Sequence, residues 1–456
     1  MKWIIETKIG LQKTAMIDRG QFYTYSELYL AVQKYKDVIQ DRVGTGHVVA
    51  IVSDYNFQAI AAFFALYETN NMIIIITDKE ADIVKQKIQQ ADCLYSLHWE
   101  NGVLQIHTHE QTADVNSNPL IGTLVGIHHA GLILLSSGTT GRPKMMIHDL
   151  SKLIDTYLNK RPKGLVFLLF LMFDHIGGIH TLLSCVAMSA AMVIPESREP
   201  EYILNLISKY HINILPVTPT FLNLLLISDA MADHDTSSLR LITYGAEAMP
   251  ESLLKRLRMA LPSVRFLQTF GTSETGIMTI VSKSSDSTIL KIADNNVEYK
   301  IVNGELLIKS QNKILGYLNY KSSSFDNEGW FYTGDLVESC CNGFIRIVGR
   351  SSSVINVGGE KVLPIEVEGV LYEMEDVSEC RVYGEANPVL GQIVAAEIFP
   401  KRKMSATEMK ALVTSHCKGR LAKYKIPMRI KILTNPIHSA RFKKKQYNFE
   451  PNFPSK

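Results

Sequence analysis

The chain has 456 residues, 46% of them hydrophobic, and a formal net charge of +3. This length suggests about three domains, and the apolar share is ample for large cores. The nearly balanced charge gives no reason to expect nucleic acid or an anionic membrane surface as a partner.

The cysteines and the start of the chain narrow the class further. The six cysteines form no Cys-x-x-Cys pair or Cys/His cluster with zinc-ligand spacing, so reduced thiols in a cytoplasmic protein are the simplest interpretation. Glu6 interrupts the first apolar run too early for a secretory signal. The most apolar run, 165–173, is far shorter than the about 20 residues that a membrane span needs. We therefore expect no membrane span.

The first part of the chain alternates strand and helix signals. Thr24 and Glu27 have the spacing of a capping box, and apolar residues follow at helical spacing. Strands are expected at 48–52 and 72–76, and helices at 57–67 and 80–90. Such alternation predicts a largely parallel sheet covered by helices.

A polar loop, Ser136 to Lys144, follows an apolar strand candidate at 132–135. It contains four hydroxyl side chains, two glycines and a lysine. Glycines let backbone N–H groups approach an anion, hydroxyls donate to its oxygens, and a lysine adds positive charge. The composition suits a polyphosphate, although no Gly-Lys-Ser/Thr closes the loop as in a Walker A motif. Composition alone leaves a polar surface loop as the alternative.

The α/β rhythm resumes beyond this loop. Strands are expected at 165–170, 191–194, 212–217, 239–244 and 264–268. Helices are expected at 180–190, 201–210 and 251–261. From about residue 278 the pattern changes to short strands, with Asn303-Gly304 and Asn342-Gly343 as tight-turn signals.

Three serines after Arg350 are a hinge candidate, and the residues beyond them mix helix and strand signals. We predict an α/β protein whose large N-terminal domain, 1–349, contains helix-covered sheets and a small β-rich subdomain. A hinge at 350–353 would join it to a small mobile α+β domain, 354–456.

An ordered series of motifs extends over nearly the whole chain. After the polar loop come 173–178 (FDHIGG), 244–247 (YGAE), 268–274 (QTFGTSE), 329–335 (GWFYTGD), 349–350 (GR), 358–368 (GGEKVLPIEVE) and 441–445 (RFKKK). In this order and spacing they resemble the adenylate-forming (AMP-binding) superfamily, and most of all its acyl- and aryl-CoA synthetases. The resemblance runs from about residue 20 to 445.

The resemblance implies ATP-dependent activation of a fatty or aryl carboxylic acid. An acyl-adenylate would form with release of pyrophosphate, and the acyl group would pass to a thiol, most simply coenzyme A. Because an anionic carboxylate attacks an anionic phosphate, such a site needs positioning and charge cancellation more than covalent chemistry. Three alternatives stay open: a carrier-protein phosphopantetheine as acceptor, a stand-alone amino-acid adenylating enzyme, and a non-catalytic nucleotide- or acyl-binding relative.

By the same resemblance, the polar loop wraps the β- and γ-phosphates of ATP. Its members are Ser136, Ser137, Gly138, Thr139, Thr140, Gly141 and Lys144. Glu274 matches the family's Mg²⁺ ligand, with Thr140 beside it as a second metal contact. One carboxylate next to substrate phosphates is a common way to hold Mg²⁺.

The nucleoside side follows from the later motifs. Asp335 matches the residue that accepts both ribose hydroxyls, which suits a carboxylate because it accepts two hydrogen bonds at once. Arg350 matches a donor to the ribose. The loop along the adenine is matched by Gly245, Ala246 and Glu247, and the segment against the base by Phe270, Gly271, Thr272 and Ser273. Phe270 stands where tyrosine is usual and keeps the stacking face.

His175 resembles the family's histidine that lines the acyl pocket near the carboxylate. The competing register puts Asp174 in the place where amino-acid-activating relatives hold the substrate ammonium. The His-Ile-Gly-Gly pattern favours His175.

The C-terminal part departs from the family pattern. Ser352 stands at a hinge position where aspartate or lysine is usual, and Phe442 where glycine is usual. These two departures motivate the non-catalytic alternative. Lys443 is the expected catalytic lysine of adenylation, with Lys444 as the other possible register. Gly358 and Gly359 match the segment along the pantetheine tunnel.

Overall fold

The computed structural model describes residues 12–111, 118–136, 143–228, 230–320 and 324–437. The chain divides into two compact units. The first contains Met1–Pro216, Gly271–Ile277 and Lys309–Gly329, and the second contains Val217–Phe270, Met278–Ile308 and Trp330–Lys456. The domain boundaries expected from the sequence, at 349 and 354, stay a prediction.

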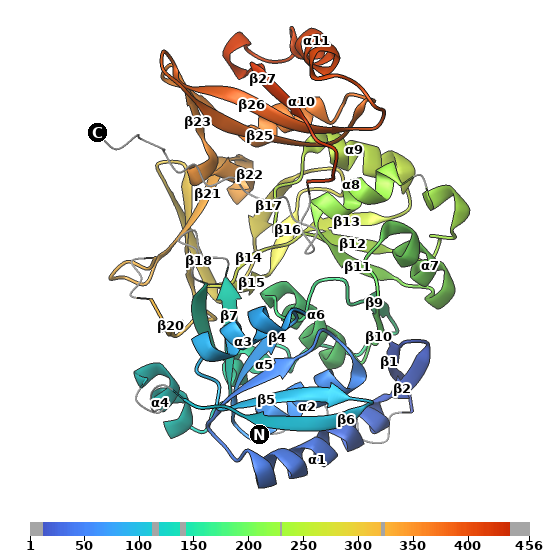
Figure 1. The fold of residues 1–456 in the computed structure, drawn as a ribbon, viewed down its shortest axis with the longest axis vertical. Coiled ribbons are helices and arrows are strands. Elements are labelled where there is room, and N and C mark those ends of the chain that lie inside the picture. The colour runs from blue at the N-terminus through green and yellow to red at the C-terminus, as the bar shows by residue number, and fades with distance from the viewer. Residues whose placement is uncertain (1–11, 112–117, 137–142, 229, 321–323, 438–456) are drawn as a thin grey trace. The chain divides into compact units, whose positions relative to one another are not determined.

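A seven-stranded sheet with the order β20-β8-β7-β4-β3-β5-β6 lies in the first unit (Figure 1). In that order its strands are Gly316–Tyr317, Lys144–Asp149, Gly131–Ser136, Met72–Ile76, Val48–Val52, Tyr95–Glu100 and Val103–Thr108. The neighbours of β3 and β4 are parallel to them, whereas β8 is antiparallel to both β7 and β20. All five residues of β4 are buried, as expected for a parallel strand covered on both faces.

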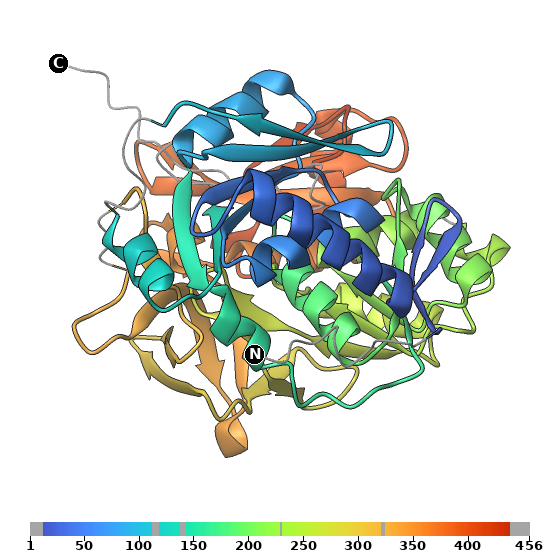
Figure 2. The ribbon, with the colours of Figure 1, turned by 90° about the horizontal axis from the view of Figure 1, so that it is seen from below.

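Helices α1 to α7 belong to the same unit. They are Tyr25–Arg42, Phe57–Glu68, Ala81–Gln90, Pro119–Gly126, Leu150–Asp155, Ile176–Ala187 and Pro200–Tyr210. The start of α1 has the expected capping box, because Oγ1 of Thr24 accepts from the backbone N–H of Glu27 and Glu27 accepts from the N–H of Thr24. In the view of Figure 2, α1 lies in front of α2, against which it packs.

A second set of strands in the first unit has the order β11-β9-β10-β1-β2. Their bounds are Ile214–Val217, Val166–Leu168, Ala191–Ile194, Thr14–Asp18 and Gln21–Thr24. β10 is parallel to β9 and β1, and β2 returns antiparallel to β1.

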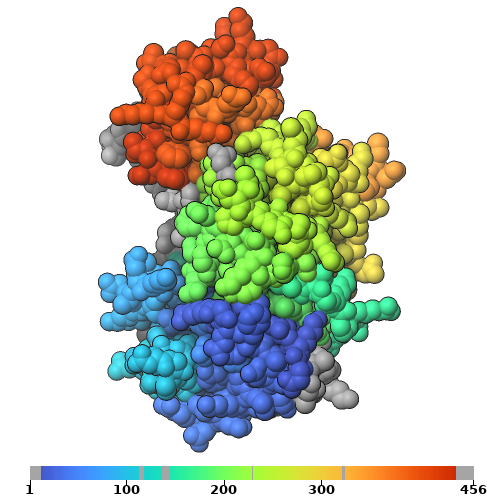
Figure 3. Space-filling model, turned by 90° about the vertical axis from the view of Figure 1, so that its right-hand side faces the viewer, coloured from blue at the N-terminus to red at the C-terminus, as the bar shows by residue number. Residues whose placement is uncertain are grey.

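The second unit begins with helices and two parallel strands. Its first helices are α8 (Pro219–Ile227) and α9 (Glu251–Ala260), and its first strands are β12 (Leu241–Tyr244) and β13 (Arg265–Gln268). In the space-filling view of Figure 3, α9 lies at the surface in yellow-green. Its Met259 is 83% exposed, whereas Leu253, Leu254 and Leu257 are buried, so this helix has one apolar face.

An antiparallel six-stranded sheet follows, with the order β16-β17-β22-β21-β19-β18. Its strands are Ile280–Ser282, Ile289–Ile292, Ile345–Arg350, Phe331–Ser339, Glu305–Ser310 and Val297–Val302. Both Asn-Gly pairs form the expected turns, since φ is 52° at Asn303, 81° at Gly304, 62° at Asn342 and 73° at Gly343.

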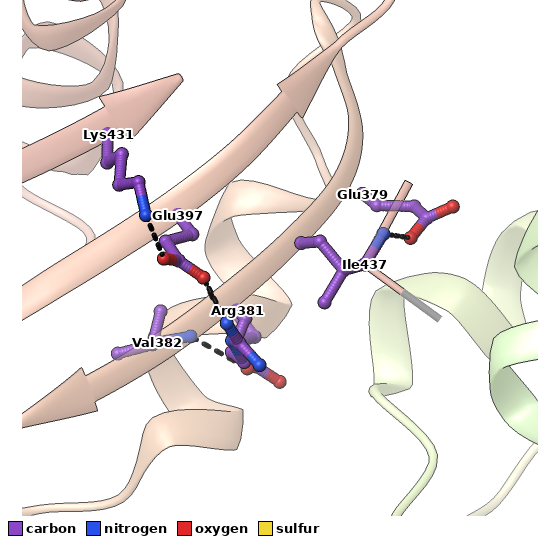
Figure 4. A network of polar contacts seen from close by, with 7 residues as sticks. Glu379, Arg381, Val382, Glu397, Lys431 and Ile437 are labelled. Atoms are coloured by element: carbon purple, nitrogen blue, oxygen red, sulfur yellow. Dashed lines mark hydrogen bonds and ion pairs between the residues drawn. The ribbon is translucent and has the colours of Figure 1, made fainter. Parts of the chain in front are cut away.

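The last sheet contains β24-β23-β26-β25, with β27 on the free edge of β26. In chain order these strands are Ile355–Val357, Glu360–Val362, Val377–Asn387, Gly391–Pro400 and Arg429–Ile432, accompanied by α10 (Pro364–Leu371) and α11 (Ala406–Cys417). Arg381, Glu397 and Lys431 are direct neighbours on three adjacent strands, and Figure 4 shows Glu397 bonded to both cations.

Some elements differ from those expected. α6 begins at Ile176 rather than 180, because His175 caps it. The strand expected at 165–170 shrinks to Val166–Leu168. The sequence pattern did not predict α8, which Thr218 caps and Pro219 begins. The expected α/β character is confirmed. Among the described residues, no helix is both long and apolar enough to cross a lipid bilayer.

Candidate functional site

The ends of the polar loop are held together by strand pairing. Ser136 ends β7 and Lys144 begins β8, and the two residues are direct partners in the antiparallel ladder. Ser137, Gly138, Thr139, Thr140 and Gly141 lie outside the described residues. The strands therefore fix where the loop leaves and re-enters the sheet.

Two tyrosine rings surround the ammonium group of Lys144. Its Nζ lies 4.5 Å from the ring centroid of Tyr320 and 5.6 Å from that of Tyr317. The two rings meet edge to face, with centroids 6.1 Å apart. Cation–π contacts of this kind hold a lysine in place and leave its charge intact.

Asn319 connects the β20 segment to the start of β8. Its side-chain Oδ1 accepts from the N–H of Met145 at 2.9 Å, and its Nδ2 donates to the carbonyl of Pro143 at 2.8 Å. The amide thus satisfies backbone groups on both sides of Lys144, which fixes the backbone at this residue.

Glu274 lies on the turn of the β14–β15 hairpin (Phe270–Thr272 and Gly276–Met278). Gly271 is required there, because a Cβ would stand 2.5 Å from the carbonyl oxygen of Gly276. The hydroxyl of Tyr317 donates to Oε1 of Glu274 at 3.1 Å. The expected Mg²⁺ ligand and Lys144 are therefore both in contact with Tyr317.

A buried histidine supports this hairpin from β8. Nε2 of His148 donates to the carbonyl of Ser273 at 2.7 Å, and the residue is 2% exposed. Burial lowers the pKa of His148 to about 4, although the hydrogen bond to Ser273 acts in the opposite direction. His148 is neutral near pH 7 and serves as a hydrogen-bond donor.

These contacts fit a magnesium ion held mainly by a nucleotide. Mg²⁺ takes oxygen ligands and commonly binds through one or two carboxylates together with substrate phosphates. In the described ranges, no group of three or more His, Cys, Asp or Glu side chains is placed to hold a metal ion. Glu274 would thus be the protein's carboxylate ligand.

In the second unit, Asp335 and Arg350 form an ion pair across β21 and β22. Nε of Arg350 lies 2.8 Å from Oδ1 of Asp335, and the arginine also donates to the carbonyl of Thr333. Asp335 is 7% exposed. Burial raises its pKa to about 6, while Arg350 acts to lower it and Glu305 to raise it.

The YGAE motif follows the end of β12. A Cβ on Gly245 would stand 2.3 Å from Oγ1 of Thr269, so only glycine fits there. Ala246 has a left-handed backbone, with φ of 67°. The carboxylate of Glu247 accepts from the hydroxyl and the N–H of Thr220 at the start of α8. The Glu247 side chain therefore holds the start of α8.

Phe270 packs into the apolar core of the six-stranded sheet with Leu290, Ile308 and Val337. Only 8% of it is exposed. Its stacking against the adenine base stays a prediction. The base would contact only the small exposed part of this side chain.

His175 caps α6. Its Nδ1 accepts from the N–H of Gly177 at 3.2 Å, so the neutral ring carries its proton on Nε2. Gly178 tolerates no side chain, because a Cβ would stand 2.1 Å from the carbonyl oxygen of Met172. The neighbouring Phe173 is buried and stacks on Tyr55, with centroids 4.4 Å apart.

Gly358 and Gly359 form the turn between β23 and β24, with φ of 59° and 93°. Nothing lies within 4 Å of a Cβ built on Gly359. Within the hinge candidate, the hydroxyl of Ser353 donates to the carbonyl of Arg350, and residues 351–353 form a short 3₁₀ turn. Lys443 and Lys444 lie outside the described residues.

The structure therefore brings Lys144 and Glu274 to one tyrosine and pairs Asp335 with Arg350. Sequence reasoning missed His148, Tyr317, Asn319 and Tyr320. No local signal could have found them, because each acts through a partner far away in the sequence.

Comparison with known proteins identifies the family of this chain. The sequence model of the AMP-binding enzyme family matches residues 72–318, and that of the AMP-binding enzyme C-terminal domain matches residues 366–440. The 2-succinylbenzoate–CoA ligase of Bacillus licheniformis is 30% identical over 337 residues, which is 68% of this chain and 68% of that protein.

Solved structures share the fold. The anthranilate CoA ligase AuaEII in complex with anthranoyl-AMP has a TM-score of 0.80 at 20% identity, covering 97% of this chain and 94% of that one. The O-succinylbenzoate CoA synthetase of Bacillus subtilis in complex with ATP and magnesium has a TM-score of 0.76 at 23% identity, covering 97% and 98%. The chain belongs to the AMP-binding enzyme family and is an adenylate-forming acid–thiol ligase.

Proposed function

We propose that this enzyme activates an aromatic carboxylic acid with ATP and transfers the acyl group to coenzyme A. The observation that carries the proposal is the Asp335–Arg350 pair, in which a buried carboxylate is held by a guanidinium at 2.8 Å. This arrangement suits a ribose diol, because the carboxylate can accept hydrogen bonds from two hydroxyl groups and Arg350 balances its charge.

The phosphate side uses the residues of the first unit. The loop hydroxyls and glycines from Ser136 to Gly141 and the ammonium of Lys144 bind the β- and γ-phosphates. Glu274 holds Mg²⁺, with Thr140 beside it. When bound, the ion neutralises negative charge on the phosphates. The protein's task is to orient the leaving pyrophosphate.

The nucleoside side uses residues of the later motifs. Asp335 and Arg350 bind the ribose, while Gly245, Ala246 and Glu247 lie along the adenine. Phe270, Gly271, Thr272 and Ser273 complete the base side. Support comes from Gly245 and Gly271, which leave no room for a Cβ and so keep both segments in fixed backbone positions.

His175 is the proposed contact of the substrate carboxylate. Its Nδ1 accepts a hydrogen bond at the helix cap, and Nε2–H is the proposed donor to the carboxylate. Two of the relatives described above act on aromatic acids, 2-succinylbenzoate and anthranilate, and this supports an aryl substrate over a fatty acid or an amino acid.

The C-terminal segment contributes to both half-reactions. The Gly358–Gly359 turn passes along the pantetheine chain, since nothing near Gly359 would obstruct a thin ligand. Lys443 bridges the carboxylate and phosphate oxygens during adenylation. Coenzyme A is favoured over a carrier protein because the relatives described above are CoA ligases.

A cytoplasmic location is part of the proposal. The six cysteines are free thiols, four of them buried, as is usual in a reducing compartment.

The deciding experiment is exchange of labelled pyrophosphate into ATP, screened over aryl, fatty and amino acids. Exchange with aromatic acids is expected, followed by thioester formation with coenzyme A but not with a phosphopantetheinyl carrier protein. Silence over the whole panel, together with intact ATP binding, would instead identify a non-catalytic nucleotide-binding relative.

A further inference from the structure

Tyr317 contacts both charged side chains of the phosphate side. Its hydroxyl donates to Oε1 of Glu274 at 3.1 Å, and its ring lies 5.6 Å from Nζ of Lys144. One side chain thus touches a prospective cation ligand and a prospective phosphate ligand of opposite charge.

Strand register explains how one residue reaches both. Tyr317 on β20 is paired with Met146 on β8, two positions after Lys144. Side chains two apart on a strand share a face, and diagonal neighbours on adjacent strands are within reach of a long side chain. The same segment bonds the hairpin, because Ile314 donates its N–H to the carbonyl of Glu274 at 2.8 Å.

The aromatic contacts bring no negative charge to Lys144. Its ammonium lies against Tyr317 and Tyr320, and no described carboxylate forms an ion pair with it. A direct Lys144–Glu274 ion pair would neutralise both groups, and neither would then be available to a nucleotide or its cation. Tyr317 contacts both groups.

We propose that Tyr317 is a positioning residue that holds Glu274 for Mg²⁺ and Lys144 for the phosphates while keeping the two from pairing. The hydroxyl occupies one carboxylate oxygen of Glu274 and leaves the second to the ion. The ring holds the ammonium by its π face. This inference rests on the proposed function.

Two variants separate the two contacts. Tyr317→Phe removes only the hydroxyl, and Tyr317→Leu removes the hydroxyl and the ring. Calorimetric titration of ATP at a series of Mg²⁺ concentrations measures the effect without any need for turnover. Tyr317→Phe is expected to raise the Mg²⁺ concentration for half-maximal ATP binding about three- to tenfold, with unchanged ATP affinity in EDTA.

Tyr317→Leu is expected to show the same Mg²⁺ effect and also to weaken metal-free ATP about threefold, because Lys144 is released. Affinity for AMP, which lacks the β- and γ-phosphates, should match wild type in both variants, and this reports on folding. Tyr202→Phe on α7 is the matched hydroxyl deletion and should leave every curve unchanged.

The inference is overturned if Tyr317→Phe keeps the wild-type Mg²⁺ dependence, or if both variants lose AMP affinity as much as ATP affinity. Its failure is distinguishable from failure of the proposed function. Wild-type protein that binds ATP with Mg²⁺ but exchanges pyrophosphate with no acid contradicts the proposed activity, while the binding titrations still decide the role of Tyr317.

Discussion

Asp335 and Arg350 are direct cross-strand partners, and the guanidinium Nε lies 2.8 Å from the carboxylate Oδ1. Burial raises the pKa of Asp335 to about 6 in spite of this cation. The carboxylate therefore changes charge close to physiological pH, in the position proposed to bind the ribose.

Nucleotide binding should consequently depend on pH through Asp335. Because the ionised carboxylate accepts the ribose hydroxyls, AMP affinity is expected to fall below pH 6, by up to about tenfold per unit. Asp335→Asn should bind AMP weakly with a flat profile between pH 5 and 8. Calorimetric titration measures both, and an equally steep profile in the variant would contradict the assignment.

His148 should make the stability of the fold depend on pH. Burial lowers its pKa from 6.5 to about 4, so the unfolded chain binds the proton more readily than the folded one. The resulting contribution to the free energy of unfolding is complete above pH 6.5 and is lost as the pH falls toward 4. The whole loss amounts to about 3 kcal/mol.

His148→Gln should therefore flatten the acid limb of the stability curve, measured by urea unfolding from pH 4 to 7.5. Part of the pH dependence of stability should remain in this variant, because burial also lowers the pKa of His180, to about 3. His128→Asn is the control, because His128 is exposed and asparagine tolerates its φ of 55°. Parallel curves for wild type and His148→Gln would refute the account.

Gly245→Ala should destabilise the second unit. The new Cβ would stand 2.3 Å from Oγ1 and 2.9 Å from the carbonyl oxygen of Thr269, and overpacking of this kind costs about 1–3 kcal/mol. Gly369→Ala on α10 is the matched control, since nothing lies within 4 Å of its Cβ, and it should gain up to about 1 kcal/mol. Equal effects in urea unfolding would be incompatible with the contact.

The two cations bonded to Glu397 (Figure 4) should contribute unequally to the stability of the fold. Burial acts to raise the pKa of Glu397, but the bonds from Arg381 and Lys431 hold it below its usual range. The Arg381 side chain is 15% exposed and that of Lys431 is 60% exposed. Arg381→Met should therefore cost about 3 kcal/mol, and Lys431→Met less than about 1 kcal/mol.

The double variant Arg381→Met/Glu397→Met tests the reason for that cost. It should recover most of the lost stability, because no buried charge is left without its partner. A double variant no more stable than Arg381→Met would show that packing, not charge, dominates this face of the sheet.

Lys443→Ala should suppress pyrophosphate exchange by about 10²–10³-fold, because a charge contact made in the transition state is lost. AMP affinity should be unchanged. If Lys444→Ala has this effect instead, the catalytic lysine is one position later.

Sequence patterns predicted those elements whose periodicity is unambiguous. β3, β4 and β10 have the expected bounds, because each is a short apolar run between turn residues. α8 was missed because seven of its nine residues are buried, so it has no polar face and no helical period in hydrophobicity.

The residues of the candidate site could likewise be predicted only in part. Motif spacing indicated the residues proposed to bind nucleotide, and two of them, Asp335 and Arg350, form an ion pair. Tyr317 and His148 could not be predicted, because their partners Glu274 and Ser273 lie far from them in sequence and only the sheet register brings them together.

The edge position of β20 also has a consequence for biosynthesis. β8 ends at Asp149, but its outer neighbour is Gly316–Tyr317. Ordering such a distant pair carries a large loop-closure cost, and non-local strand pairing is slow. A nascent chain that ends before residue 317 would contain Lys144 without its contacts to Tyr317 and Tyr320. The surroundings of this proposed phosphate ligand are therefore completed late in synthesis.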